Sequence, residues 1–270
     1  DAKEFLNFAE QQMFAVMNRR TVTNVASISA VLLKAMERID QRMRGTLGTD
    51  AVETGFAELD KLTGGLHNSE LIILAARPSM GKTALAMNIA ENVSIHQAVP
   101  TLFVSLEMSS MELADRLLCS VGRINGHRRR NGTLPQDERR RLVETAGKVS
   151  RGKLHVDDSP SRTVTEIAAA ARRIKRVEGR LGLIVIDYLQ LIEPDNPSDP
   201  RQEQVAKIAR RLKGLAREIE TPVLCLAQVN RQTEDAREHR PRLSHLRESG
   251  AIEQDADVVM FVHREEYYRR

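Results

Sequence analysis

The sequence predicts an α/β fold with a mostly parallel central sheet and helices on both of its faces. Two observations support this fold class. From residue 56 onward, short apolar runs alternate with helical patterns, which is typical of parallel strands joined by helical crossovers. The runs are rich in Ile, Leu and Val, and most do not alternate with polar residues, as expected for strands buried on both faces.

Five runs are predicted strands, and four segments between them are predicted helices. The strands cover residues 71–75, 101–105, 183–186, 222–227 and 258–262. The helices cover residues 82–96, 111–124, 165–178 and 202–220. Ligands of such sheets bind at the carboxyl ends of the strands, so the residues directly after each strand are the first candidates for a functional site.

Residues 1–44 contain neither Pro nor Gly and are predicted to be helical. Their apolar residues recur at steps of three and four, which forms one stripe on a helix: Val25, Ile28, Leu32, Ala35 and Ile39. Residues 45–55 break this pattern and are predicted to be a linker. The stripe alone fits two arrangements equally: the helix packs on the chain's own core, or it docks on a neighbouring subunit.

Composition excludes several classes of protein. The 270 residues allow one large domain, or one domain with a small appendage. Aromatic residues make up only 3% of the chain, which argues against base stacking as the main mode of nucleic-acid binding. Cys119 and Cys225 are too far apart in sequence to form a zinc motif, and they fit a reducing compartment. No apolar run approaches the ~20 residues of a membrane span, and no secretory signal is visible, so we expect a cytoplasmic protein without a membrane partner.

A phosphate-binding loop follows the first strand directly. The segment reads Ala76-Arg77-Pro78-Ser79-Met80-Gly81-Lys82-Thr83, with Ala76 in place of the usual first glycine of the pattern. Such a loop directs several backbone N–H groups at one point, and the dipole of the following helix adds positive potential there. Gly81 allows close approach to a phosphate, Lys82 supplies a positive charge for the β- and γ-phosphates, and the Thr83 hydroxyl is a suitable ligand for Mg²⁺.

Three other strand ends carry polar residues whose roles the pattern leaves open. Glu107 either activates an attacking water or caps the start of a helix. Asp187 either serves a magnesium ion or caps a turn. Gln228 either senses a γ-phosphate or is an ordinary polar strand end. The functional alternative is favoured for all three residues together, because parallel strands place their carboxyl ends at the same edge of the sheet.

The chain resembles the RecA-like motor domain of the DnaB family of replicative helicases. The matching motifs are residues 75–83, 105–109, 186–190 and 247–257, and together they spread over most of residues 55–265. The resemblance implies four segments: residues 1–24 as the remnant of an N-terminal domain, 25–44 as a linker helix, 45–55 as a linker, and 56–270 as a RecA-like P-loop ATPase domain. It also implies that the linker helix docks on the adjacent subunit of a homo-hexamer.

The resemblance assigns roles to residues at matching positions. Glu107 matches the catalytic base, Lys82 and Gln228 complete the catalytic set, and Thr83 with Asp187 matches the Mg²⁺ site. Residues matching nucleotide contacts are Ser79, Gly81, Lys82, Thr83, Ala84 and Arg116. Arg247, Glu248 and Gly250 match the loop that holds single-stranded DNA. The family's arginine finger is expected in a hairpin beyond Arg270, because nothing earlier in the chain matches it.

The expected function is that of a hexameric motor using ATP or another NTP with Mg²⁺ to translocate on single-stranded DNA and unwind duplex DNA. The resemblance also implies primase and a helicase loader as partners. Two alternatives stay open: a RecA- or RadA-like recombination ATPase, and a nucleotide-gated DNA-binding scaffold without productive turnover. Residues 123–153 are strongly basic. A phosphate-binding patch is one interpretation, but a solvated helix surface or a subunit contact is favoured, because the family's DNA-binding loops lie elsewhere.

Overall fold

The computed structural model describes residues 27–43, 51–230, 241–246 and 249–267. The chain divides into two compact units, Asp1–Thr49 and Asp50–Arg270. In the first unit, α2 (Ile28–Met43) is an amphipathic helix within the segment for which a linker helix is predicted. Val25 and residues 1–24 of the predicted helical segment lie outside the described residues.

A six-stranded sheet forms the centre of the second unit, in the order β5-β4-β6-β7-β3-β8, and each neighbouring pair is parallel. The strands are β3 (Leu71–Ala76), β4 (Thr101–Ser105), β5 (Leu154–Asp157), β6 (Leu183–Asp187), β7 (Val223–Gln228) and β8 (Val258–Val262). All five predicted strands are confirmed to within one residue at each end. A separate antiparallel pair consists of β1 (Ala51–Val52) and β2 (Leu66–His67).

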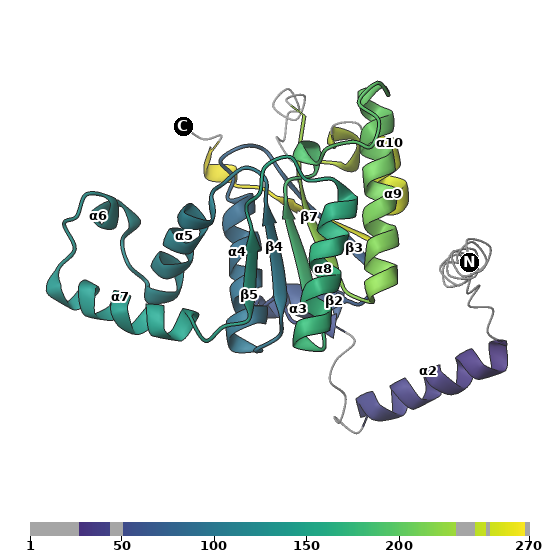
Figure 1. The fold of residues 1–270 in the computed structure, drawn as a ribbon, viewed down its shortest axis with the longest axis horizontal. Helices are drawn as coiled ribbons and strands as arrows, with labels where there is room; N and C mark the ends of the chain where they lie inside the picture. Colours follow the sequence, from purple (N-terminus) through teal and green to yellow (C-terminus); the bar gives the residue numbers. More distant parts are fainter. Residues whose placement is uncertain (1–26, 44–50, 231–240, 247–248, 268–270) are drawn as a thin grey trace, which may run out of the picture. The chain divides into compact units, whose positions relative to one another are not determined.

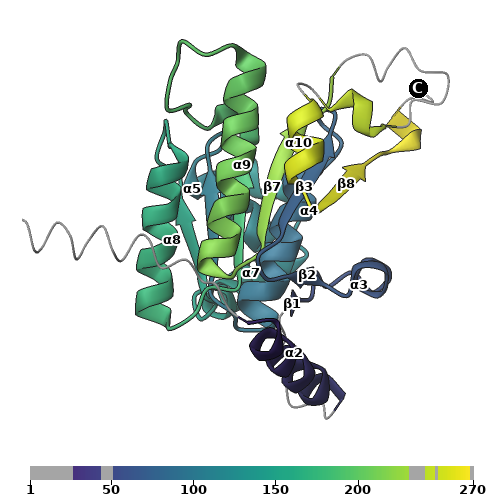
Figure 2. The same cartoon turned by 90° about the vertical axis from the view of Figure 1, so that its right-hand side faces the viewer.

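Helices cover both faces of this sheet, as predicted (Figure 1). On one face α4 (Lys82–Glu91), which continues as a π-helical turn (Asn92–His96), lies with α5 (Ser110–Gly122). On the other face α8 (Val164–Glu178) and α9 (Arg201–Ile219) lie side by side, as Figure 2 shows. Successive residues of β3 alternate between the two cores: Leu71 and Ile73 pack under α8 and α9, and Ile72 and Leu74 pack under α4.

Four further helices and three 3₁₀ turns complete the described part of the second unit. They are α3 (Ala57–Thr63), α6 (Gly126–Arg130), α7 (Gln136–Val149) and α10 (Ser249–Asp255), with 3₁₀ turns η2 (Leu189–Leu191), η4 (Leu243–His245) and η5 (Glu265–Tyr267). No described helix has the length and apolar character needed to cross a membrane.

Three of the basic residues of α6 and α7 form ion pairs with acidic neighbours. Arg128 pairs with Glu138, Arg129 with Asp115, and Arg141 with Asp137. The first two pairs tie α6 to α7 and to α5. These arginines are thus partly neutralised by acidic neighbours, which weakens the interpretation of the segment as a phosphate-binding patch.

Two glycines give a matched test of the packing. A Cβ added to Gly182, just before β6, would lie 2.0 Å from Val99 Cγ1, whereas one added to Gly214 in the exposed interior of α9 meets nothing within 4 Å. We expect Gly182→Ala to lower the free energy of unfolding by about 1–3 kcal/mol through overpacking. We expect Gly214→Ala to raise it by about 1 kcal/mol, because alanine is the better helix former. Urea unfolding followed by circular dichroism measures both, and a neutral Gly182→Ala would contradict the packing described.

Candidate nucleotide-binding site

A cavity of about 560 Å³ lies at the carboxyl ends of the strands. It gathers eight residues that the sequence predicts to bind nucleotide or take part in its hydrolysis: Ser79, Gly81, Lys82, Thr83, Ala84, Glu107, Arg116 and Gln228. They come from the loop after β3, the first turn of α4, the ends of β4 and β7, and α5. The parallel sheet therefore brings together residues that are up to about 150 positions apart in the chain.

The loop between β3 and α4 has the backbone of a phosphate cradle. Ser79 and Gly81 have φ angles of 65° and 97°, in the left-handed region that glycine adopts most readily. Met80 between them is buried and anchors the loop in the core. Gly81 is the N-cap residue of α4, and no side chain caps this helix, so its first N–H groups are open to an anion in the cavity.

Asp187 joins the strand end of β6 to the first turn of α4. Its carboxylate is fully buried, and Oδ2 accepts a hydrogen bond of 2.7 Å from the Thr83 hydroxyl. Lys82 Nζ lies 3.8 Å from Asp187 Oδ1, which has no hydrogen-bond partner among the described residues. The two loop residues predicted to bind phosphate and Mg²⁺ are therefore linked directly to the predicted second carboxylate.

Burial lowers the pKa of Lys82, and the nearby charges of Asp187 and then Glu107 partly oppose this effect. The ammonium group also lies 4.6 Å from the ring centroid of Tyr188, a distance suited to a cation–π contact. Tyr188 lines the cavity but is not among the predicted site residues. Its position directly after Asp187, at the end of a buried strand, is the signal that could have identified it.

Glu107 lines the same cavity as the phosphate loop and does not cap α5, which was its alternative role. The cap of α5 is made by Ser109 and Glu112, which bond each other's backbone N–H groups. Asp158 accepts the N–H of Ser110 at 2.7 Å. The turn that carries Glu107 is held instead by Ser105, whose hydroxyl bonds the backbone of Met108. The glutamate is thus exposed on a fixed turn beside the cavity.

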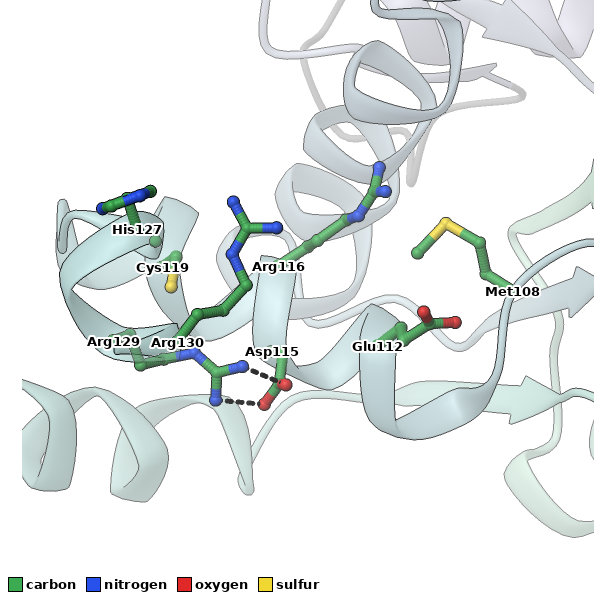
Figure 3. A pocket seen from close by; sticks show the side chains of 9 residues that line it. Met108, Glu112, Asp115, Arg116, Cys119, His127, Arg129 and Arg130 are labelled. Carbon is green, nitrogen blue, oxygen red and sulfur yellow. Dashed lines mark hydrogen bonds and ion pairs between the residues drawn. The ribbon is translucent and has the colours of Figure 1, made fainter. Parts of the chain in front are cut away.

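A second cavity, of about 360 Å³, shares Met108 and Arg116 with the first and lies between α5 and α6 (Figure 3). In Figure 3 the guanidinium of Arg129 faces Asp115, whereas that of Arg130 points away from this pair. Arg116 therefore stands at the boundary between the two cavities, on the exposed side of α5.

The residues predicted to bind DNA are only partly described. Arg247 and Glu248 lie outside the described residues, and the backbone of Gly250 belongs to the first turn of α10 rather than to a loop. The segment just before them is attached to the end of β7. Val229 forms a bridge with Leu246, and the Asn230 N–H donates to the His245 carbonyl at 2.9 Å.

The donors at the cavity fit a magnesium ion together with phosphate oxygens. Within the described ranges, no group of three or more His, Cys, Asp or Glu side chains is placed to hold a metal by itself. The Thr83 hydroxyl and the Asp187 carboxylate are hard oxygen donors, and the buried Oδ1 has unused acceptor capacity. Mg²⁺ commonly takes few protein ligands and completes its shell with water and phosphate oxygens.

Comparisons with known proteins agree with this geometry. A family model described as "DnaB-like helicase C terminal domain" matches residues 51–270. "Replicative DNA helicase DnaC" of Bacillus subtilis (strain 168) is 41% identical over 269 residues, covering 99% of this chain and 59% of the relative. "Replicative DNA helicase DnaB" of Pasteurella multocida (strain Pm70) is 43% identical over 274 residues, with the same coverage. The chain thus spans about 59% of the length of these curated relatives.

Two solved structures share the fold. One, described as an ATPase domain, superposes with a TM-score of 0.84 at 36% identity, covering 91% of this chain and 86% of that one. The other, described as a DnaB-like replicative helicase, superposes with a TM-score of 0.80 at 33% identity, covering 99% and 67%. The predicted fold class is confirmed by these similarities.

The charge of Lys82 predicts how nucleotide affinity depends on pH. Phosphate binding needs the ammonium form, so nucleotide affinity should fall as pH rises through the lysine pKa, which burial places below its ordinary value of 10.5. Asp187→Asn removes the nearest charge that raises this pKa, so the fall should begin at lower pH in the variant. Titration with a fluorescent ADP in metal-free buffer, from neutral to alkaline pH, measures the shift. Glu144→Gln on the exposed side of α7 is the control, and an unchanged midpoint in Asp187→Asn would refute the coupling.

Proposed function

Because the chain belongs to the family of DnaB-like helicase C-terminal domains, we propose that it is the motor domain of a replicative DNA helicase. In this role it couples ATP hydrolysis to translocation on single-stranded DNA and to duplex unwinding. The observation that carries the proposal is that Glu107 and Gln228 line the same cavity as Lys82 of the phosphate loop. A binding module without turnover has no need of a carboxylate opposite that loop.

The triphosphate binds along the loop. Ser79, Gly81 and Ala84 contribute backbone N–H groups at the start of α4, where the helix dipole favours negative charge. Lys82 extends into the cavity and neutralises charge on the β- and γ-phosphates. Arg116 reaches the nucleotide from α5, across the cavity from the loop. The ring of Tyr188 supports the lysine ammonium and restricts where it can move.

Glu107 is the general base of the hydrolysis. It accepts a proton from the attacking water, and its fixed turn directs that water at the γ-phosphate. Gln228 lies at the end of β7, where its amide can bond the γ-phosphate and respond to its loss. Mg²⁺ would be held by Thr83 directly and by Asp187 behind it, and it would neutralise charge on the phosphates.

The single-stranded DNA contacts are Arg247, Glu248 and Gly250. Support for coupling comes from the bridge between Val229 and Leu246, because Gln228 directly precedes one end of that bridge and Arg247 directly follows the other. A change at the γ-phosphate can therefore reach the proposed DNA-binding residues through Gln228, the bridge and Arg247. With few aromatic side chains in the chain, DNA is held through its phosphates.

The assembly that fits this role is a homo-hexamer in which the linker helix of residues 25–44 docks on the adjacent subunit. Residues 1–24 then represent the end of an N-terminal domain. The linker predicted for residues 45–55 ends earlier, because Ala51 and Val52 form β1 of the second unit, which begins at Asp50 and represents the motor. One of the two solved structures is described as a helicase together with its interactions with primase, and we extend that partner, together with a loader, to this chain. We also propose that the protein is cytoplasmic, because its two cysteines are free and fit a reducing compartment.

Hydrolysis is tested with two variants of different kinds. Lys82→Ala should lose nucleotide binding and hydrolysis together, because the main phosphate charge is removed. Glu107→Gln should bind nucleotide normally but hydrolyse it about 10²–10⁴-fold more slowly, because only the base is lost. Phosphate release with and without single-stranded DNA, beside binding of a fluorescent ATP analogue, separates the two. Equal hydrolysis by wild type and Glu107→Gln would refute the catalytic assignment and leave a nucleotide-gated scaffold as the better description.

DNA binding is tested through its dependence on salt. Arg247→Ala should weaken binding of a labelled oligothymidylate and make the plot of log affinity against log salt shallower by about one unit, because one phosphate contact is lost. Fluorescence anisotropy across a salt series measures both effects. Arg140→Ala on the exposed side of α7 is the control and should change neither. Binding that is insensitive to salt in the wild type would contradict the phosphate-contact mode.

A further inference from the structure

We propose that Gln190 is a positioning residue that links Gln228 at the nucleotide cavity to the loop of residues 193–200. The proposal deepens the proposed function and rests on it. Gln190 lies in η2, the 3₁₀ turn that follows Asp187 and Tyr188 directly. It does not line the cavity itself. It ends the matching motif of residues 186–190, but the resemblance assigns no role to it.

The first contact joins Gln190 to the end of β7. Strand pairing between β6 and β7 stops at Ile186 and Cys225, so no backbone ladder holds the end of β7 on its β6 side. There the side-chain Oε1 of Gln190 accepts the backbone N–H of Gln228 at 3.4 Å. On the opposite side, Gln228 remains paired with Ala76 of β3, the first residue of the phosphate loop. Gln190 therefore takes the place of a strand neighbour beside the residue proposed to sense the γ-phosphate.

The second contact joins Gln190 to the start of α9. Its backbone carbonyl accepts a hydrogen bond of 2.5 Å from Arg201 Nη2, and Arg201 Nη1 donates to Gln204 Oε1 at 3.0 Å. The Gln204 amide then donates to the carbonyls of Pro197 and Asp199, at 3.1 and 2.8 Å. Gln204 is only 9% exposed. A continuous set of contacts thus runs from Gln228 to the loop through two buried or half-buried glutamines.

The loop has few internal degrees of freedom and is tied to its neighbours by several contacts. Three of its eight residues are prolines, at positions 194, 197 and 200, which restrict its backbone. The N–H of its first residue, Glu193, donates to the Arg162 carbonyl at 2.9 Å, and Asp195 pairs with Arg211 of α9. Asn196 donates to Asp199 at 2.8 Å. A shift at Arg201 or Gln204 is therefore passed to a segment with few internal degrees of freedom.

The side chain of Gln190 is not explained by packing. Its Nε2 is buried and has no hydrogen-bond partner among the described residues, an arrangement that is costly for an amide. An apolar side chain of similar size, such as methionine, would avoid that cost. What the amide provides and methionine lacks is the acceptor for Gln228. The bond is long at 3.4 Å, so a small movement of the strand end would strengthen or break it.

The consequence is a response of the loop to the γ-phosphate. When Gln228 engages a γ-phosphate, the end of β7 shifts, and the bond to Gln190 changes with it. Gln190 moves η2 relative to Arg201, and Arg201 with Gln204 moves the loop. This is a second route out of the cavity, separate from the bridge between Val229 and Leu246. Two elements that share one strand end are thereby biased by the same ligand group.

Hydrogen exchange of the full 270-residue chain tests the proposal. The exchanging amides of this loop are compared with ADP bound and with a non-hydrolysable ATP analogue bound; they are those of Glu193, Asp195, Asn196, Ser198 and Asp199. In the wild type we expect exchange rates to differ by at least about threefold between the two nucleotides. Gln190→Met should abolish the difference while ADP affinity stays within about twofold, because Lys82 and Thr83 are untouched. Gln190→Glu keeps an acceptor oxygen and should retain the difference.

Gln202→Met makes the same chemical change at an exposed position on α9 and should behave as wild type. The role of Gln190 is overturned if Gln190→Met keeps the wild-type response, if Gln190→Glu loses it as completely, or if ADP affinity falls in parallel with it. It is also overturned if wild type binds both nucleotides with identical exchange. If wild type binds neither nucleotide, the proposed function itself fails and Gln190 loses its role with it.

Discussion

The carboxylate of Asp187 is a negative charge with no exposed surface, and a buried charge is tolerated only when partner groups surround it. Thr83 and Lys82 are those partners, and both belong to the first turn of α4. This contact spans β7, which lies between β3 and β6 in the sheet. The phosphate loop, its helix and a strand two positions away are thus held together by one group, and the cavity above them takes its shape and polarity from that contact.

The end of β7 is the point where the chemistry of the cavity meets the rest of the molecule. Gln228 faces the nucleotide cavity, its backbone is held between Ala76 and Gln190, and the next residue, Val229, bridges to Leu246. Both routes out of the cavity therefore start within two residues of each other. Under the proposed function, this arrangement lets the binding or loss of one phosphate affect two surface segments.

The sequence alone predicted the strands that are buried on both faces of the sheet and the loop whose motif has a fixed spacing. The five apolar strands and residues 76–83 fall in this class. The sequence alone did not predict the strand at the edge of the sheet or a helix that is largely exposed to solvent. Strand β5 has only four residues, including His155 and Asp157, and is partly exposed, so it lacks an apolar run. Helix α7 buries only Glu138 and Thr145, so it lacks an apolar stripe. The role of Gln190 depends on tertiary contacts with Gln228 and Arg201 that no local pattern encodes.

Helix α4 begins after Gly81 without a side chain to cap it. Its first backbone donors therefore depend on solvent or an anion, next to a lysine whose positive charge burial disfavours. One anion bound at the loop would accept hydrogen bonds from these N–H groups and would also neutralise the charge of the lysine. The stability of this domain is accordingly a property of the chain and its nucleotide together, and it will follow the ratio of free nucleotide to its dissociation constant. Under the proposed function, a fall in the nucleotide pool of the cell would lower the folding stability of this domain as well as its turnover.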